Sequence, residues 1–466
     1  SDVCSSDLLY ATQFKNLPIG QMEEKFADYG EVQIKQLNDR SKMYYTPNKE
    51  NNVFQLVVQY GAGEREFPKL GYAAQLMNNA GIMGAYEPQE LKEELSKLNA
   101  TCHVTADDDN LYIIMEGYEA TLPQACQLLS RQILMPKLDE KQLARLKGSA
   151  MGMRQQRKDN VSILNEALRQ YMLYGEKSDY IKELTDKEIY ELQISELTGD
   201  INRASNYEAK VFFTGTLPFD QVYDILSKNL PLVANERPSN SPQAKDMMPV
   251  TENTVYFLPN NDAEQAQIHL YIPMQKADKK DDVLRSAFNQ YFGLDFTGIV
   301  LNEIREKRSM AYTAYAFVGT QGIAGKASYL RGYIGTQNDK ANDALDVLMG
   351  LVNDMPKNPE RIDNIKSYLR QAMLTSHPSF RNKAMELVDL GYRGYTDDPA
   401  KENLPKVDAL TFDDIVKFYE ENIKDKPYCI SIMGNPKNID LKRLEKFGKV
   451  VKLNERKLFN TKDALF

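Results

Sequence analysis

The sequence predicts an α+β fold in which one type of domain occurs twice along the chain. The first observation is a short motif, YYTPN at 44–48, which returns as YFLPN at 256–260, an offset of 212 residues. The second is that a run rich in β-branched and aromatic residues follows each copy, at 52–60 and at 265–274, as is typical of core strands. Because strand-like and helical segments alternate irregularly, an α+β fold is favoured over a doubly wound parallel sheet.

A third observation extends the repeat to two helices. One amphipathic segment ends in Met135-Pro136-Lys137 and another ends in Met355-Pro356-Lys357, an offset of 220 residues. A helix does not readily continue through proline, so both segments are predicted to end there. Both have apolar residues at helical spacing: Leu122, Cys126, Leu129 and Ile133 in the first, and Ala344, Leu348, Leu351 and Met355 in the second.

A proline-rich stretch separates the two copies. Residues 231–249 hold four prolines among polar residues with no apolar period, which predicts an inter-domain linker. Residues 1–8, SDVCSSDL, resemble translated sequencing-adapter DNA, so we expect the natural N-terminus to lie upstream. The predicted organisation is a leader at 1–29, a first domain at 30–230, a linker at 231–252, a second domain at 253–455 and a tail at 456–466.

Composition excludes several classes of function. The 466 residues are 42% hydrophobic and 27% charged, values typical of a soluble globular protein with sizeable cores. A net charge of −8 without a basic block argues against a nucleic-acid partner. No apolar run approaches the ~20 residues of a membrane span. Of the four cysteines, Cys102, Cys126 and Cys429 lie outside the adapter-like stretch and are predicted to be small buried thiols.

The segment 295–312 is predicted to place a guanidinium and a phenol near one point. Its first part has helical spacing and should end near Ser309, with Arg305 in the last turn. An aromatic-rich strand then follows, with Tyr312 at its start. The apolar positions that define the helix are Phe296, Ile299, Val300 and Ile304.

The stretch Leu301–Tyr312, LNEIREKRSMAY, resembles the arginine/tyrosine signature of the insulinase (pitrilysin-like) zinc metallopeptidases, L-R-E-x-x-x-x-A-Y. Arg305 and Tyr312 match that pair, whereas Ser309 stands where the family usually has glycine. The resemblance implies that each domain is a mostly antiparallel sheet with helices packed on one face. It also implies that Arg305 and Tyr312 are catalytic residues, which stabilise the negative charge on the former carbonyl oxygen during peptide hydrolysis.

A solvated helix end followed by a half-buried tyrosine is the alternative interpretation of this segment. Aligning 91–102 with 301–312 places Leu95 opposite Arg305 and Cys102 opposite Tyr312. The scaffold therefore does not need the pair in both copies, which favours the functional interpretation.

The zinc motif of the same family, H-x-x-E-H, is absent from the sequence. The stretch at 71–81 aligns with it and places Ala74, Met77 and Asn78 at the ligand and base positions. Alanine and methionine offer no hard donor, and an amide is a poor zinc ligand. The third ligand of the family is a glutamate, yet 141–165 contains none, and its one carboxylate is Asp159. We therefore expect no metal and no cofactor in this chain.

The three histidines do not form a site by spacing. His103 lies near the position of an asparagine on the substrate-pairing edge strand of the family, so a substrate-binding role is one possibility beside a structural one. His269 alternates with apolar residues in a predicted core strand. His377 precedes proline at a predicted helix break.

Two hypotheses of function follow. In the first, the chain is the zinc-less half of an insulinase-type metalloendopeptidase and encloses a peptide, while an H-x-x-E-H half, fused or separate, supplies zinc. In the second, it is a non-catalytic scaffold or peptide-binding subunit of the same fold, which would not need Arg305 and Tyr312 at the family spacing. The resemblance slightly favours a bacterial periplasmic location.

Overall fold

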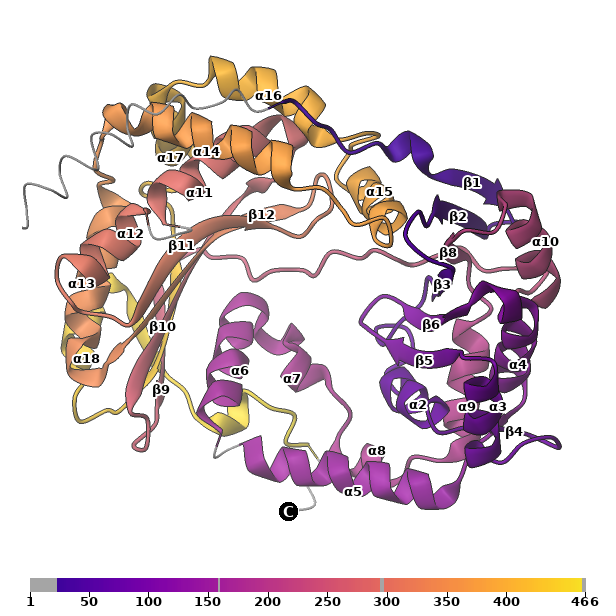
Figure 1. Cartoon of the computed structure of the whole chain (residues 1–466). Coiled ribbons are helices and arrows are strands. Elements are labelled where there is room, and N and C mark those ends of the chain that lie inside the picture. The colour runs from indigo at the N-terminus through magenta and orange to yellow at the C-terminus, as the bar shows by residue number, and fades with distance from the viewer. Residues whose placement is uncertain (1–22, 158–159, 294–296, 463–466) are drawn as a thin grey trace, which may run out of the picture.

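The computed structural model describes residues 23–157, 160–293 and 297–462. Two six-stranded sheets stand on opposite sides of the molecule, and most helices lie outside them (Figure 1). The adapter-like residues 1–8, which belong to the predicted leader, lie outside the described part of the chain. Among the described residues, no helix is both long and apolar enough to cross a bilayer.

The first sheet has the strand order β1-β2-β8-β3-β6-β5. All neighbours are antiparallel except β2 and β8, which run parallel. Its strands are β1 (Gln33–Gln36), β2 (Lys42–Pro47), β3 (Val53–Tyr60), β5 (Thr101–Ala106), β6 (Leu111–Tyr118) and β8 (Ala209–Gly215). A separate small ladder joins β4 (Gly81–Ile82) to β7 (Pro136–Lys137).

The second sheet has the order β11-β12-β10-β13-β9-β14. Its strands are β9 (Thr254–Pro259), β10 (Gln265–Lys276), β11 (Thr313–Thr320), β12 (Ala327–Gln337), β13 (Cys429–Gly434) and β14 (Lys449–Lys452). Five strands repeat the first sheet in order and direction, because β9-β13-β10-β12-β11 corresponds to β2-β8-β3-β6-β5 and β13 is again parallel to β9. The predicted fold class, a duplicated and mostly antiparallel α+β domain, is confirmed.

The repeated YxxPN motif ends an equivalent strand in each copy. Pro47 and Pro259 are the last residues of β2 and β9. The asparagine that follows donates its backbone N–H to the last residue of the parallel neighbour, Asn48 to Gly215 O at 2.7 Å and Asn260 to Gly434 O at 2.9 Å. The motif therefore recurs because both sheets need the same strand end.

The helices follow the same repeat. In the first half they are α2 (Leu70–Met77), α3 (Pro88–Lys97), α4 (Leu122–Leu134), α5 (Glu140–Gln156), α6 (Val161–Tyr174), α7 (Asp179–Lys182), α8 (Asp186–Tyr190), α9 (Ile194–Ala204) and α10 (Phe219–Asn229). In the second half they are α11 (Asp282–Phe292), α12 (Ile299–Leu301), α13 (Ala341–Asn353), α14 (Ile362–Thr375), α15 (Lys383–Tyr392), α16 (Pro399–Ala409), α17 (Phe412–Asn422) and α18 (Leu441–Leu444). As predicted, α4 and α13 end just before the two Met-Pro-Lys motifs.

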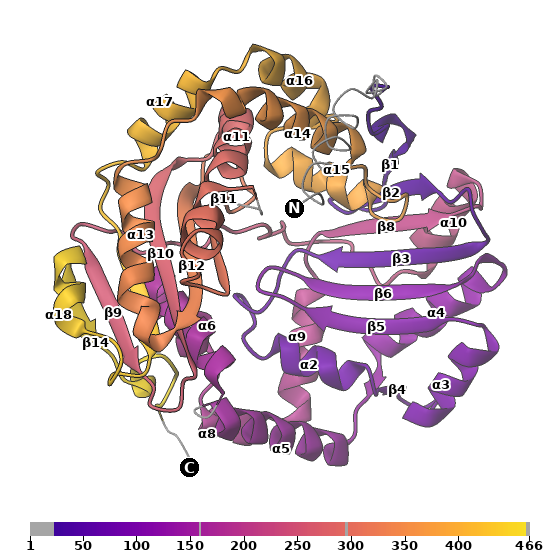
Figure 2. The ribbon, with the colours of Figure 1, turned by 60° about the vertical axis from the view of Figure 1, so that its left-hand side comes forward.

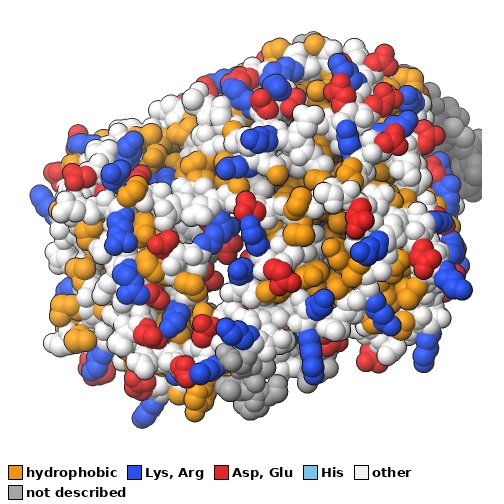
Figure 3. Space-filling model, turned by 180° about the vertical axis from the view of Figure 1, so that it is seen from behind, with side chains coloured by type: hydrophobic (Ala, Val, Ile, Leu, Met, Phe, Trp, Pro, Cys, Tyr) orange, Lys and Arg blue, Asp and Glu red, His pale blue; other side chains and the backbone are white. Residues whose placement is uncertain are grey.

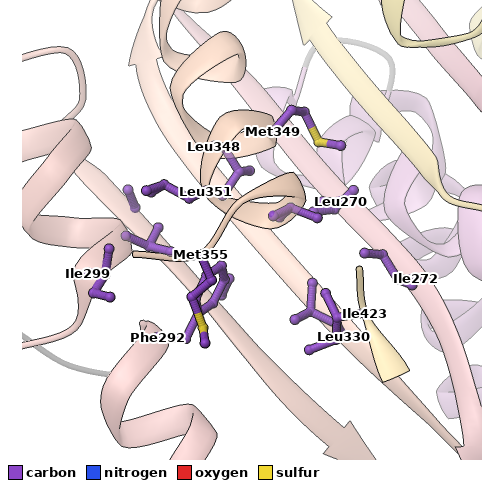
Figure 4. Close-up of a cluster of buried hydrophobic side chains, with 14 of the residues drawn as sticks. Leu270, Ile272, Phe292, Ile299, Leu330, Leu348, Met349, Leu351, Met355 and Ile423 are labelled. Carbon is purple, nitrogen blue, oxygen red and sulfur yellow. The ribbon is translucent and has the colours of Figure 1, made fainter. Parts of the chain in front are cut away.

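Each half has its own apolar core between its sheet and its outer helices. In the second half, side chains of β10 and β12 meet those of α13 and of the segment after α11 (Figure 4). Leu270, Leu330 and Leu348 are all fully buried there. The alternating burial of β11 and β12 turns every second side chain into this core.

Two equivalent helices cross between the halves, which the sequence did not predict. Helix α6 of the first half packs on the inner face of the second sheet, where Leu164 and Leu168 meet Leu258 and Met433. Helix α15 of the second half packs on the inner face of the first sheet. Both views show the helices lying between the two sheets (Figure 2). Because each half covers apolar surface of the other, the two halves stabilise one another.

The segment 231–252 contains no helix or strand and runs from α10 to β9. Two segments outside the predicted domains also pack on the molecule. Ala27 and Tyr29 are buried against Leu390 and Tyr395, and Leu458 of the predicted tail is buried in the cluster that includes α6.

Candidate functional site

Arg305 lies at the end of a helix whose last turn is wider than an α-helix. Helix α12 continues as a π-turn over 302–306, in which Lys307 N–H donates to Asn302 O at 2.9 Å. The predicted helix is present and places Arg305 in its last turn, but that turn has π and not α geometry. Residues 294–296 lie outside the described part of the chain. Ile304 points into the core and is fully buried, which leaves the next side chain, Arg305, in solvent. Such π-turns are frequent at functional sites.

The Arg305 guanidinium is held weakly by its neighbours. Its side chain is 44% exposed, and Nε lies 3.5 Å from Glu306 Oε1. An exposed pair of this kind contributes little to stability. The guanidinium is therefore accessible to a ligand.

Tyr312 directly precedes β11, which is an edge strand of the second sheet. Its backbone N–H donates to Gly335 O at 2.9 Å, which fixes its position. The residue is 54% exposed, and its hydroxyl accepts a hydrogen bond from Gln337 Nε2 at 3.2 Å. The hydroxyl proton remains available for donation to a ligand.

A tight turn at Ser309 joins the two elements. Ser309 has a φ of 50°, in the left-handed region, and its N–H donates to Arg305 O at 2.8 Å. Met310 N–H donates to Ile304 O at 2.9 Å. The departure from the glycine of the family thus falls on a residue whose backbone conformation favours glycine.

We predict that Ser309→Gly raises the free energy of unfolding by up to ~1 kcal/mol, because it relieves the left-handed strain of a residue with a Cβ. Ser309→Ala should give no such gain, since alanine keeps the Cβ. Denaturant unfolding of both variants is the measurement. An S309G protein that is less stable than S309A would show that the turn is not strained.

The strand register corrects one predicted equivalence. Thr101 pairs with Glu116 and, through it, with Gln55, whereas Thr313 pairs with Gly335 and Gly335 with Gln267. Since β3 and β10 are equivalent at an offset of 212, Tyr312 corresponds to Ala100 and not to Cys102. The left-handed residue that follows the helix is Asn99 in the first copy and Ser309 in the second. Thr101 follows it by two residues and Thr313 by four, so the second copy has two extra residues between the turn and the strand.

The three residues that align with the zinc motif, Ala74, Met77 and Asn78, have structural contacts. Ala74 and Met77 are buried in the core of the first half. Asn78 caps the C-terminus of α2 and binds the backbone of β5 with both atoms of its amide. It donates to Val104 O and accepts from Val104 N–H, each at 2.8 Å. Asn78 therefore binds the N–H and C=O of Val104, which point away from the sheet at the edge strand β5.

The second copy closes its edge strand by the same chemistry. Asn289 in α11 donates to Val318 O at 3.0 Å and accepts from Val318 N–H at 2.6 Å. Buried backbone groups need such partners, and an edge strand with open rungs invites unwanted pairing. The sequence interpretation missed this role because it tested Asn78 only as a metal ligand. An asparagine in or just after the last turn of the equivalent helix in both copies was the available signal.

We expect Asn78→Ala to lower the free energy of unfolding by ~1–3 kcal/mol, since it removes two hydrogen bonds from one backbone rung. Gln75→Ala, on an exposed position of the same helix, is the matched control. Hydrogen exchange at the Val104 amide should speed up in N78A. Unchanged exchange at the Val104 amide would contradict the two hydrogen bonds between Asn78 and Val104.

Metal ligands do not cluster in the part of the chain that the structure describes. No group of three or more His, Cys, Asp or Glu side chains is placed to hold an ion among these residues. Asp159, the carboxylate noted in 141–165, lies outside them.

The three histidines have different surroundings. His103 is exposed on β5, and His377 is exposed in the loop after α14. His269 in β10 is buried, with Nε2 3.0 Å from Asn165 Oδ1 of α6. Its burial and the nearby guanidinium groups of Arg331 and Arg169 lower its pKa to about 3.

Comparison with known proteins identifies a family model over part of the chain. Residues 205–369, which include Arg305 and Tyr312, match the peptidase M16 inactive domain. No curated protein sequence matches the chain.

Solved structures share the fold across most of the chain. The peptidase M16 inactive domain from Pseudomonas fluorescens superposes with a TM-score of 0.67 at 17% identity, over 88% of this chain and 99% of that one. The ferredoxin protease FusC, solved with Arabidopsis ferredoxin, gives 0.69 at 12%, over 89% of this chain and 46% of FusC. The periplasmic protease PqqL from Escherichia coli gives 0.60 at 13%, over 92% of this chain and 50% of PqqL. The chain thus spans about half the length of these two proteases.

The arginine/tyrosine signature, the duplicated fold and the family model agree with one another. Residues 205–369 match the family model of the peptidase M16 inactive domain, and the chain has the fold of the solved peptidase M16 inactive domain.

Proposed function

We propose that this chain is the zinc-less half of a metalloendopeptidase and that Arg305 and Tyr312 bind the scissile carbonyl of a peptide. The observation that carries the proposal is the pair itself. An accessible guanidinium and an accessible phenol flank one tight turn, in a chain whose own zinc-motif positions are buried or bound to backbone. The similarity to about half of FusC and half of PqqL supports a role beside a second half.

The chemistry assigned to the pair is electrostatic. During peptide hydrolysis the carbonyl oxygen becomes an oxyanion, and a fixed positive charge with an O–H donor stabilises that oxyanion more than the neutral carbonyl. The zinc and the general base belong to the partner half in this proposal. Arg305 supplies the charge, and Tyr312 donates its hydroxyl proton while its oxygen accepts from Gln337.

Charge on the surface is consistent with a peptide rather than a polyanion as ligand. Seen from behind, Lys and Arg side chains are interspersed with Asp and Glu, and no continuous basic face is visible on this side (Figure 3). A peptide bond needs only local donors, which the pair provides.

A titration tests the proposal. A constant amount of the M16-type half that carries H-x-x-E-H, produced as a separate polypeptide, is mixed with increasing amounts of this chain, and cleavage of a quenched fluorescent peptide is followed. We expect turnover to rise and to saturate at a fixed stoichiometry. Turnover independent of this chain would reject the proposal and favour a scaffold subunit of the same fold.

A further inference from the structure

A cavity of about 720 Å³ opens where the segment 231–252 passes over the first half. Most of its wall comes from the loop between β3 and α2, the hairpin between β5 and β6, the chain around α7, and residues 243–246. Its volume falls within the ~300–1,000 Å³ that is typical of small-molecule sites. Because most of the side chains in this wall are charged, we expect a charged ligand.

One carboxylate in this cavity lacks a cationic partner. Among the described residues, four of the five carboxylates that line the cavity form ion pairs with Arg or Lys. The pairs are Asp108–Arg65, Asp179–Lys245, Glu183–Arg157 and Asp246–Lys177. The fifth, Glu64, forms neither an ion pair nor a side-chain hydrogen bond in the described part of the chain. Lys182 also lines the cavity, but it is exposed and does not act on Glu64.

The surroundings of Glu64 hold its carboxylate in place without neutralising it. Its backbone N–H donates to Asp107 O at 2.8 Å. Its side chain lies against α2 at Gly71, where a Cβ would collide with Glu64 Oε1. The charges that act on it are the carboxylates of Asp107, Asp108 and Asp179, which together with burial raise its pKa to about 7. A bound cation would offset both the burial and the repulsion, and a carboxylate perturbed in this way inside a cleft is typical of a binding site.

An organic cation fits this cavity better than a metal ion does. Calcium and magnesium ions take about six or more oxygen ligands, whereas no group of three or more metal-binding side chains occurs among the residues that the structure describes. A primary ammonium ion has three N–H donors and can bind a single carboxylate through a charge-assisted hydrogen bond. The volume of the cavity also leaves room for the organic part of such a ligand.

We propose that this cavity binds the primary ammonium group of an organic ligand, with the Glu64 carboxylate as its ion partner. The ligand supplies to Glu64 the cation that Arg and Lys side chains supply to the other four carboxylates. The site is separate from Arg305 and Tyr312 and does not require a zinc-bearing partner.

The test measures binding to the full chain by isothermal titration calorimetry. The probe is n-pentylamine, and n-pentanol is its uncharged counterpart. Glu64→Gln removes the charge with little change in size, and Glu66→Gln, which does not line the cavity, is the control matched in net charge. Gly71→Ala keeps the carboxylate but displaces it, whereas Gly148→Ala adds a Cβ with no atom within 4 Å. Thermal unfolding shows that the four variants are folded.

We expect n-pentylamine to bind at least ~10-fold more tightly than n-pentanol at pH 8, since a charge-assisted hydrogen bond supplies that difference. E64Q should weaken binding of the amine by ~10-fold or more and G71A by ~3-fold or more. E66Q and G148A should leave the affinity within twofold. Nα-acetyl-lysine methylamide, which carries the same ammonium group on a peptide unit, distinguishes two sources: tighter binding of this compound assigns the site to a lysine side chain, and tighter binding of n-pentylamine assigns it to a free amine.

The pH dependence of binding gives a second readout. The amine stays cationic, so its affinity for the wild type should fall between pH 8 and 6, as Glu64 takes up a proton. The other titratable groups around Glu64 are Asp107, Asp108, Asp179 and Tyr72. E64Q keeps all four, and its affinity should not change with pH over this range.

Four results would overturn the proposal. Equal affinity for n-pentylamine and n-pentanol would show that the ammonium group is not recognised. Equal effects of E64Q and E66Q would reduce the binding to attraction by net charge. Wild-type affinity in G71A would contradict the contact assigned to the carboxylate. The same pH dependence in E64Q as in the wild type would assign the titration to a group other than Glu64.

Discussion

Arg305→Ala and Tyr312→Phe are each expected to lower kcat for peptide cleavage by ~10²–10³-fold in the assembly with a zinc-bearing half. The loss should appear in kcat and in kcat/KM, because the pair interacts more strongly with the oxyanion than with the ground-state carbonyl. If both donors bind the same oxygen, the double variant should lose much less than the product of the single losses. Steady-state kinetics at saturating zinc-half concentration is the measurement.

Tyr315→Phe is the matched control for this result. Tyr315 lies on β11 three residues after Tyr312, and its ring packs at a tilt against those of Phe317 and Tyr333, at centroid distances of 5.9 and 5.3 Å. Removing its hydroxyl should leave turnover within about twofold, since that hydroxyl lies outside the matched signature. Wild-type turnover in both R305A and Y312F would leave Arg305 as an ordinary helix-end charge, as the scaffold hypothesis requires.

The second large effect is the pH dependence of the free energy of unfolding that His269 causes at the contact between the halves. His269 has a pKa of about 3 in the folded protein, chiefly because it is buried, against ~6.5 in an unfolded chain. Above pH 6.5 the imidazole is neutral in both states and contributes no pH dependence. Between pH 6.5 and 3 only the unfolded chain takes up the proton, so the folded state loses about 1.4 kcal/mol of stability per pH unit.

His269→Gln should remove this loss while the amide of glutamine can still donate to Asn165. We expect the free energy of unfolding of the wild type to fall by about 2 kcal/mol more than that of H269Q between pH 6.5 and 5. His103→Gln, at an exposed position, should behave as the wild type does. Denaturant unfolding at the two pH values decides the matter, and an identical fall in wild type and H269Q would show that His269 is not the group responsible.

The duplicated fold could be predicted because the repeated residues end strands and helices, which are local structural features. Pro47 and Pro259 end equivalent strands, and the asparagine after each makes the same backbone bond. Proline after α4 and α13 ends equivalent helices. Such signals act within a few residues, so they are legible without knowledge of the tertiary structure.

Other features could not be predicted because they depend on contacts distant in sequence. The packing of α6 and α15 on the opposite sheets leaves an ordinary amphipathic pattern in each helix. Spacing at i, i+3 and i+4 does not distinguish an α-turn from the π-turn that positions Arg305. Asn78 can bind the backbone of β5 only because β5 is an edge strand. The order of strands in a sheet cannot be predicted from a local motif.

Arg305 and Tyr312 could be identified from the sequence, whereas the equivalent positions in the first half could not. The alignment without gaps placed Cys102 opposite Tyr312, but the strand register assigns Ala100 to that position. The two extra residues lie between the turn and the strand, where insertions are accommodated most easily. The domain limits at 30–230 and 253–455 stay a prediction. The crossed helices make independent folding of each half unfavourable.

Metal content measured together with activity tests the central claim most directly. The chain is purified without chelator, alone and in assembly with the zinc-bearing half, and zinc is quantified by mass spectrometry beside peptide turnover. The account predicts no stoichiometric zinc and no cleavage for the chain alone, and one zinc per assembly with cleavage that depends on Arg305. One tightly bound zinc per isolated chain, or cleavage by the isolated chain, would contradict it.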